Sequence, residues 1–253
     1  MWPGSDPTLC FTFDLDWAPD DILEDLHGLL HEAAIPVTFF CTHATTGTER
    51  LLQLPNCEAA IHPNFLSDRQ PELVLGELLA QYPSAVGVRN HVLFYHSRLL
   101  TLFHSAGLEY LSNDLMFLHA ELAPFYDWSG LVRLPIFWED DVHCIFFEQR
   151  FEEEALNLRT PGLKILSFHP VHLYLNSQDM VSYQAGKHAL RDPASARAAR
   201  RANGRGIRTL FLDLLARAGT YKTATLSQVA ATFKERNVYQ GHYAAFLSRL
   251  PQR

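Results

Sequence analysis

Residues 8–17 are TLCFTFDLDW. The apolar and aromatic run from Thr8 to Leu15 predicts a buried strand. An amphipathic helix is expected directly after it, from Asp21 to Ala33, with Asp20 or Asp21 as its N-cap. Because a strand followed by a helix is the repeating unit of α/β proteins, the start of the chain favours that fold class.

The remainder of the chain continues this alternation. Further strands are expected over 36–42, 58–61, 85–89, 108–111, 131–137, 163–168 and 221–225, and helices over 71–81, 96–106, 207–218 and 226–236. About eight strands, with no glycine-rich turn of the nucleotide-binding kind, favour an irregular (β/α) barrel of about seven to eight strands over a doubly wound sheet. We therefore expect a single catalytic domain over residues 1–253, with its chemistry at the C-terminal ends of the strands.

The composition excludes several classes of protein. The 253 residues are 47% apolar and 19% charged, with a formal net charge of −7. This mixture excludes global disorder, and the negative charge argues against nucleic acid as a partner. No run reaches the roughly 18 to 20 apolar residues of a membrane span. The opening MWPGSDP lacks the features of a secretory signal, and the cysteines are scattered, so we expect buried thiols and a cytoplasmic protein.

Two carboxylates lie at the end of the first strand. Asp14 and Asp16 are two residues apart, so on a strand both side chains point to the same face. Converging carboxylates repel each other unless a cation balances them. A divalent metal can do so, while one carboxylate acts as a base toward a water molecule. The chain also has 13 histidines, and His62 directly follows another predicted strand.

Later strand ends carry the partners that such a site needs. Arg89 and His91 are also two residues apart, so the arginine could pair with an aspartate and the histidine could complete a metal site. His169 ends an apolar strand, where a histidine is a natural general acid. Trp138 and Asp140, in a group of acids after another strand, offer a sugar-stacking aromatic and an orienting acid.

The segment 187–208 departs from the pattern. It is rich in Ala, Gly and Ser, and its basic residues are Lys187, Arg191, Arg197, Arg200, Arg201, Arg205 and Arg208, against the single acid Asp192. Two interpretations stay open. The segment is either a solvated, mobile insertion or a clamp for an anionic substrate, such as a nucleotide-diphosphate or lipid-phosphate sugar.

In their order along the chain, these motifs resemble those of the polysaccharide deacetylase family. This family is also called the NodB homology domain or carbohydrate esterase family four, and the similarity is greatest to its WbmS-like branch. The resemblance runs from FTFDLDW at 11–17, through PVTFF at 36–40, to TATLSQVA at 223–230. It implies a NodB-like irregular barrel. It also implies metal-dependent removal of an N-acetyl group from a sugar, in surface-polysaccharide or nucleotide-sugar biosynthesis.

The resemblance also implies roles for the matching residues. Asp14 would be the catalytic base and Arg89 its partner. Asp16 and His62 would bind a divalent metal, with Zn²⁺ the first choice, and His169 would be the general acid. The implied substrate is an acetylated amino sugar, linked to a phosphate if the basic segment is a clamp.

One position departs from the family pattern. The second histidine of its second motif falls on Leu66, which cannot bind a metal. His91 is therefore predicted as the third ligand, with His172 and Asn64 as alternatives. Trp138 and Asp140 resemble the fourth motif loosely and would contact substrate. The missing histidine leaves open a non-catalytic sugar-binding protein of the same fold. A second alternative keeps hydrolysis but changes the acyl group, as in a deformylase of a lipid-linked sugar, whose phosphate the basic segment would suit.

Overall fold

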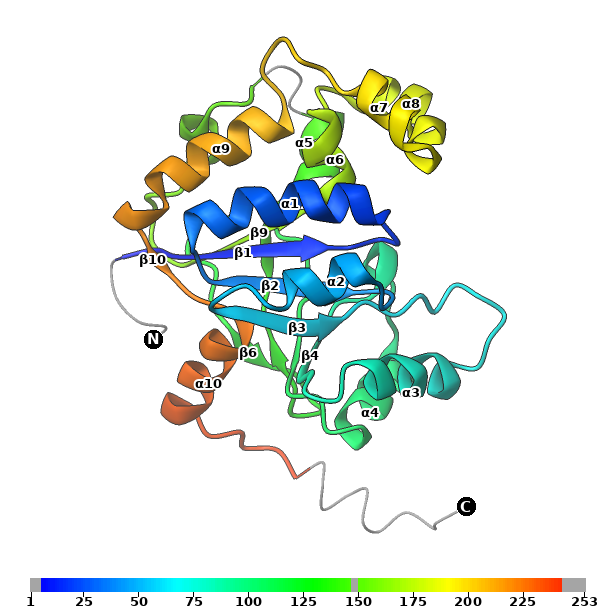
Figure 1. Ribbon diagram of the computed structural model, residues 1–253. Coiled ribbons are helices and arrows are strands. Elements are labelled where there is room, and N and C mark those ends of the chain that lie inside the picture. Colours follow the sequence, from blue (N-terminus) through cyan, green and yellow to red (C-terminus); the bar gives the residue numbers. More distant parts are fainter. Residues whose placement is uncertain (1–5, 147–149, 243–253) are drawn as a thin grey trace.

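A central, mostly parallel sheet organises the computed structural model, which describes residues 6–146 and 150–242 (Figure 1). Its strands are β1 (Thr8–Asp14), β2 (Val37–Cys41), β3 (Cys57–Ile61), β4 (Gly87–Val88), β5 (Tyr110–Leu111), β6 (Phe125–Tyr126), β7 (Val132–Arg133), β8 (Ile136–Glu139), β9 (Leu163–Phe168) and β10 (Lys222–Thr223). Their order is β6-β7-β5-β4-β3-β2-β1-β9-β8, and β10 pairs with β1. Only β6 and β7 are antiparallel among these pairs in the described residues.

The sheet curls, and its β8 edge comes back beside the chain that follows β5. β7 and β8 belong to one run of chain interrupted at Pro135, and β7 pairs with β5 while β8 pairs with β9. Backbone hydrogen bonds of 2.8 Å join this run to the chain after β5, from Ile136 N–H to the Asp114 carbonyl and from Leu118 N–H to the Phe137 carbonyl. The expected irregular (β/α) barrel is therefore confirmed. The short antiparallel β6 was not predicted.

Burial of whole strands explains their continuous apolar sequences. All seven residues of β1 are buried. The ring of Phe13 lies 5.6 Å from that of Phe39 on β2 and 5.9 Å from that of Phe168 on β9. Full burial of one such side chain contributes about 1.5–3 kcal/mol. This aromatic layer fixes β1 between its two neighbours, and so fixes where its C-terminal end lies.

Helices cover the outside of the curled sheet (Figure 1). They are α1 (Asp20–Ala33), α2 (Thr46–Leu51), α3 (Pro71–Gln81), α4 (Ser97–Ser105), α5 (Asp140–Phe146), α6 (Pro170–Leu175), α7 (Met180–Gly186), α8 (Pro193–Ala199), α9 (Ile207–Arg217) and α10 (Leu226–Arg236). The longer ones were predicted from their periodicity, but α2, α5, α6, α7 and α8 have only six or seven residues. So short a helix shows too few turns for a periodic pattern.

Two local expectations have different outcomes. The predicted aspartate N-cap of α1 is wrong, because Pro19 occupies that position and Asp20 and Asp21 lie in the first turn. There they still interact favourably with the helix dipole. The helix expected over 96–106 is confirmed as α4 (Ser97–Ser105), and Gly107 directly beyond it has the left-handed φ of +79° that favours glycine.

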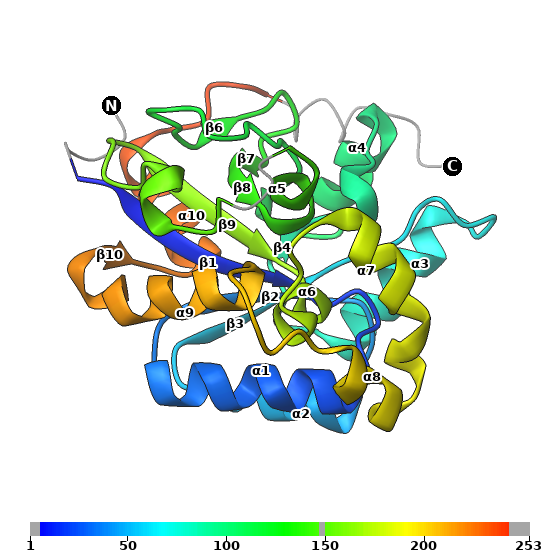
Figure 2. The same ribbon diagram turned by 90° about the horizontal axis from the view of Figure 1, so that it is seen from above.

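The segment 187–208 is not an irregular connection. It contains a short 3-10 helix, η3 (Lys187–Arg191), followed by α8. In Figure 2, α7 and α8 lie on the side toward which β1 and β9 point.

Among the described residues, no helix is both long and apolar enough to cross a membrane. The cysteines are free, and all except the half-buried Cys57 are buried, as expected.

Candidate active site

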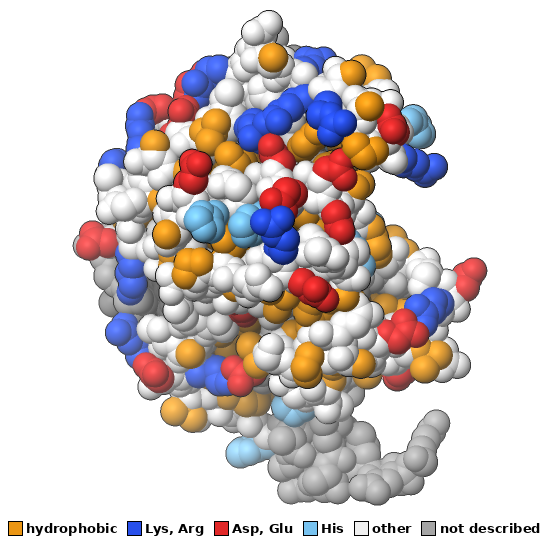
Figure 3. All heavy atoms as spheres, viewed as in Figure 1, with side chains coloured by type: hydrophobic (Ala, Val, Ile, Leu, Met, Phe, Trp, Pro, Cys, Tyr) orange, Lys and Arg blue, Asp and Glu red, His pale blue; other side chains and the backbone are white. Residues whose placement is uncertain are grey.

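One pocket of about 810 Å³ lies at the C-terminal ends of the strands. This volume is typical of a small-molecule site, for which about 300–1,000 Å³ is usual. Asp16 after β1, His91 after β4 and His169 after β9 line it, together with Trp17 and residues of α7 and η3. Figure 3 shows the corresponding notch on the right side of the molecule. The predicted position of the site is thus where the structure has its pocket.

Asp16 lies between two histidines. Its Oδ1 atom is 3.1 Å from His62 Nε2 and 3.1 Å from His91 Nδ1. The donor atoms of these three residues all lie within 4.8 Å of one another. One carboxylate and two imidazoles form a donor set that suits zinc, which commonly takes three protein ligands and one water at a catalytic site. The group therefore fits a divalent metal.

The turn after β1 is unusual in its backbone. Asp16 and Trp17 have φ values of 43° and 54°, a left-handed conformation that non-glycine residues adopt at a cost of roughly 1–3 kcal/mol each. The turn is held in part by a 3.0 Å hydrogen bond from Trp17 N–H to Thr42 Oγ1. It places the Asp16 carboxylate in the pocket, beside the two histidines.

The electrostatic setting of Asp16 favours its charged form. Burial raises the pKa of this carboxyl, but hydrogen bonding to His62 and His91 and the charge of His169 lower it by more. The net result is a pKa well below the usual range. A permanently ionised carboxylate is what a metal ligand requires.

The alternative third ligands lie elsewhere. Asn64 accepts the N–H of Leu66 at 3.0 Å in a local turn, and the Leu66 side chain is exposed. His172 Nδ1 lies 2.9 Å from Ser177 Oγ, and this histidine belongs to a second group with Asp140 and His169. The structure thus brings His91, rather than His172 or Asn64, to Asp16 and His62.

Asp14 and Arg89 form a buried ion pair. Asp14 Oδ1 accepts a 2.8 Å hydrogen bond from Arg89 Nη1, and both side chains are nearly inaccessible to solvent. Arg89 also donates to Thr12 Oγ1, Ser167 Oγ and two oxygens of Ser112, at 2.9–3.0 Å. The guanidinium is therefore fixed on several sides. The sequence predicted the ion pair but gave no signal for the hydroxyl partners, which come from β1, β9 and the end of β5.

His169 is held by Asp140 through two contacts. Asp140 Oδ2 accepts the backbone N–H of His169, and Asp140 Oδ1 lies beside His169 Nδ1, both at 2.7 Å. Burial lowers the pKa of His169, but Asp140, Asp16 and Asp14 outweigh it and hold this pKa well above the usual value. His169 Nε2 lies 3.7 Å from Asp16 Oδ2. These carboxylates thus favour the cationic, doubly protonated form of the ring, and Nε2 faces the Asp16 carboxylate.

The expected substrate contacts of Trp138 and Asp140 need correction. Trp138 is fully buried, donates from Nε1 to His143 Nδ1 at 3.0 Å and packs on Phe168. It offers no face to a sugar. Asp140 is also fully buried and contacts His169 instead of the pocket. The exposed aromatic in the pocket is Trp17, at 47% exposure. The only sequence signal for it is its place next to Asp16.

Two acids beside Asp140 were noted only as neighbours in the sequence. Burial, followed by the charge of Asp141, raises the pKa of Glu139 to about 8. Asp141 lines the pocket, and burial raises its pKa too. Clustered acids with raised pKa values are typical of functional sites.

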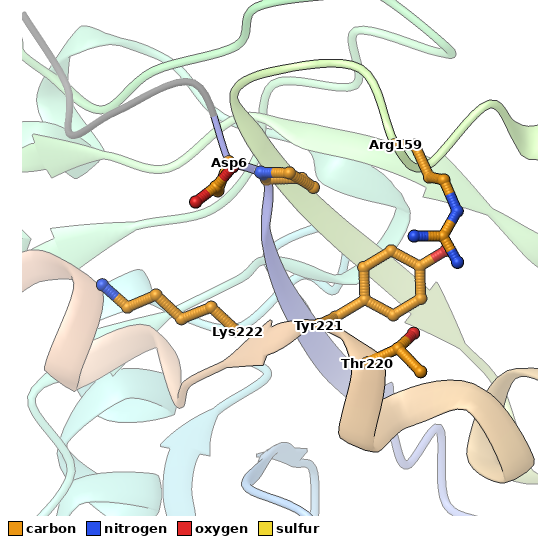
Figure 4. Close-up of a pocket in the computed structure, with 6 residues that line it drawn as sticks. Asp6, Arg159, Thr220, Tyr221 and Lys222 are labelled. Carbon is orange, nitrogen blue, oxygen red and sulfur yellow. The ribbon is translucent and has the colours of Figure 1, made fainter.

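A different pocket lies at the opposite ends of the strands. It has a volume of about 410 Å³ and is lined by Asp6, Pro7, Arg159, Thr220, Tyr221 and Lys222, near the starts of β1 and β10 (Figure 4). The Arg159 guanidinium lies 5.3 Å from the centre of the Tyr221 ring. None of the lining residues belongs to a group of potential metal ligands in the described part of the chain.

Comparisons with known proteins show which family and fold the chain resembles. A model of the WbmS-like polysaccharide deacetylases matches residues 11–187. A solved structure of WbmS from Bordetella bronchiseptica, described as a polysaccharide deacetylase involved in O-antigen biosynthesis, is 32% identical. Its TM-score is 0.77, and the match covers 83% of this chain and 90% of that one.

Two further solved structures are similar at lower identity. A polysaccharide deacetylase from Mycobacterium smegmatis is 18% identical, with a TM-score of 0.56 and 93% of each chain covered. A family 4 carbohydrate esterase from Bacillus anthracis is 16% identical, with a TM-score of 0.47, 89% of this chain and 83% of that one covered. A search of curated proteins returned no match.

Proposed function

Because the chain belongs to the WbmS-like polysaccharide deacetylases, we propose that it is a metal-dependent hydrolase that removes an N-acetyl group from an amino sugar. The sugar would be a phosphate-linked precursor in surface-polysaccharide or nucleotide-sugar biosynthesis. One observation carries the proposal: Asp16 and His91, two members of the potential metal-ligand group with His62, line the same pocket as His169, a histidine with a raised pKa.

Asp16, His62 and His91 would hold the metal. Their donor atoms already converge, and Asp16 is ionised without it. When bound, a metal such as Zn²⁺ would lower the pKa of a water molecule to about 7 and polarise the acyl carbonyl. The other residues of the site would then handle protons and hold the substrate.

Asp14 would take the proton of the attacking water. Arg89 is fixed by its hydroxyl partners, so it holds the Asp14 carboxylate in one orientation. A positioned general base contributes typically about 10²–10⁴-fold to the rate.

His169 would protonate the leaving amine. Its Nδ1 atom is engaged by Asp140, so Nε2, on the side of Asp16, is the nitrogen that can donate to the substrate. As the C–N bond breaks, the proton moves from Nε2 to the sugar nitrogen. Hydroxide from water has by then bonded to the acyl carbon, so the products are acetate and a free amino sugar.

The base assignment is tested with Asp14→Asn, with Asp68→Asn on the exposed loop before α3 as the matched control. We expect Asp14→Asn to lose about 10²–10⁴-fold in turnover of an N-acetylated sugar while it keeps about one metal ion per chain. Asp68→Asn should keep both properties. Full activity of Asp14→Asn would overturn the role of Asp14. A wild type that binds metal and sugar but hydrolyses neither N-acetyl nor N-formyl substrates would overturn the enzymatic proposal.

The ligand assignment has its own test. Elemental analysis should find near one equivalent of metal in the wild type, much less in His91→Ala, and an undiminished amount in His172→Ala. Undiminished metal in His91→Ala would remove this histidine from the ligand set. Turnover of N-acetyl and N-formyl forms of one sugar then decides which acyl group is removed.

A further inference from the structure

The pocket has two chemically different walls. The carboxylates and histidines at the strand ends form one of them. The other consists of α7 and η3 and contributes Tyr183, Lys187 and Arg191, among others. In Figure 3, Lys or Arg side chains lie at the upper edge of the notch, where α7 and α8 protrude. A substrate in this pocket would therefore meet carboxylates at one end and cations at the other.

Most other arginines of the segment 187–208 are already engaged. Arg200 and Arg208 form ion pairs with Asp25, at 3.2 and 2.5 Å. Arg205 pairs with Asp213, and Arg201 donates to Gln178 Oε1 at 2.9 Å. These residues attach the segment to the body of the protein, so they are not available to a ligand.

Lys187 and Arg191 differ from those arginines. Both side chains are exposed and line the pocket, and within the described residues neither has an ion pair or a side-chain hydrogen bond. Two acids line the pocket, Asp16 and Asp141, and in the described residues neither forms an ion pair with Lys187 or Arg191; Asp16 is paired with histidines instead. The chain as a whole has a net charge of −7, yet this wall of the pocket carries two cations that form no ion pair with an acid in the described residues.

We propose that Lys187 and Arg191 bind the phosphate of a phosphate-linked amino sugar whose acyl group lies at the Asp16 end of the pocket. Arginine presents paired N–H donors that match phosphate oxygens, and lysine adds a mobile point charge. Two cations suit a phosphate, which carries about −1.5 to −2 charges as a monoester. The position of the acyl end rests on the proposed function, but the phosphate contact does not.

The test measures binding by calorimetry with metal-loaded, full-length protein. The probes are N-acetylglucosamine, N-acetylglucosamine 1-phosphate and UDP-N-acetylglucosamine. We expect the phosphate-bearing probes to bind at least about tenfold more tightly than the free sugar, and this gain to shrink as salt is raised. The double variant Lys187→Ala/Arg191→Ala should lose the gain. Arg197→Ala, an exposed arginine on α8 outside the pocket lining, is the matched control and should keep it.

Several outcomes would overturn the proposal. Equal affinity of the wild type for free and phosphorylated sugar would do so, and so would an equal loss in Arg197→Ala, which would indicate general charge attraction. A gain that survives in the double variant would place the phosphate at the metal. Tighter binding of glucuronic acid than of the phosphorylated probes would indicate a carboxylate ligand instead. Because the readout is binding, it stands even if no sugar is hydrolysed. The single variant Lys187→Gln gives a weaker loss if the double variant does not fold.

Discussion

Replacing Glu139 with glutamine should remove a large pH-dependent loss of stability. Glu139 is the last residue of β8 and is buried. Burial, then the charge of Asp141, raises its pKa from the ordinary 4.5 to about 8 in the folded protein. The folded state therefore keeps a proton that the unfolded chain releases once the pH exceeds 4.5.

The sign and size of the effect follow from this difference. A raised pKa in the folded state means that stability is fully present below pH 4.5 and falls as the pH rises toward 8. The slope is about 1.4 kcal/mol per pH unit, so the full loss is about 5 kcal/mol. Glutamine has nearly the same shape and no proton to release, so it should not show this loss.

The assay is urea unfolding at pH 5 and pH 7 of protein kept metal-free with a chelator, because a bound metal would change the electrostatics of the site. The free energy of unfolding of Glu139→Gln relative to wild type should rise by about 3 kcal/mol between the two pH values. Glu235→Gln, an exposed position on α10, should run parallel to wild type. His169 adds a loss of stability with rising pH above its ordinary pKa of 6.5, but wild type and variant share it. Parallel curves for Glu139→Gln and wild type would refute the reasoning.

Three further predictions follow from the site. Asp140→Asn removes the main charge that raises the pKa of His169, so the alkaline limb of the pH–rate profile should move to lower pH; an unchanged limb would contradict the acid role. Arg89→Gln leaves the Asp14 carboxylate buried without its cation and should cost about 3–5 kcal/mol in urea unfolding, and a cost below about 1 kcal/mol would show that water reaches the pair. Trp138→Phe loses one buried hydrogen bond and should lower the free energy of unfolding by about 1–3 kcal/mol. KM for the sugar should stay unchanged, and a raised KM would show that Trp138 contacts the substrate.

The strand ends of the site were predictable because they follow from local rules. The C-terminal ends of parallel strands meet at one rim, which places Asp14 at the end of β1. Asp16 was expected there by alternation along the strand, but it reaches the rim through the left-handed turn that follows β1. The buried aromatic run of β1 fixed the first of these ends. The Arg89–Asp14 pair could be predicted because the curled sheet brings its strand ends to one rim, where a long arginine side chain reaches from the end of β4 to the end of β1 although β2 and β3 lie between them.

Other features depend on tertiary contacts that leave no local pattern. Trp138 and Trp17 both stand near acids in the sequence, yet one is fully buried beneath the site and the other is 47% exposed in the pocket. The difference arises because Trp138 is the third residue of a buried strand, whereas Trp17 lies in a left-handed turn beyond a strand. The helical elements α7 and η3 were not predicted, since elements this short show no clear period, although the basic residues of η3 were noted as a possible clamp for an anion.

The third ligand position shows how far strand-end geometry constrains a site whose motif has changed. Ile61 of β3 pairs in register with Val88 of β4, so the loops that follow the two strands leave the sheet side by side. His91 N–H donates to the Pro63 carbonyl at 3.0 Å, which ties these loops together next to His62. An imidazole from the second loop can therefore reach the space that a ligand on the first would otherwise fill. We infer that such a site requires ligand atoms that converge at the rim, and that it matters less which strand each ligand follows. This is why the leucine at position 66 does not by itself argue for a lost metal site.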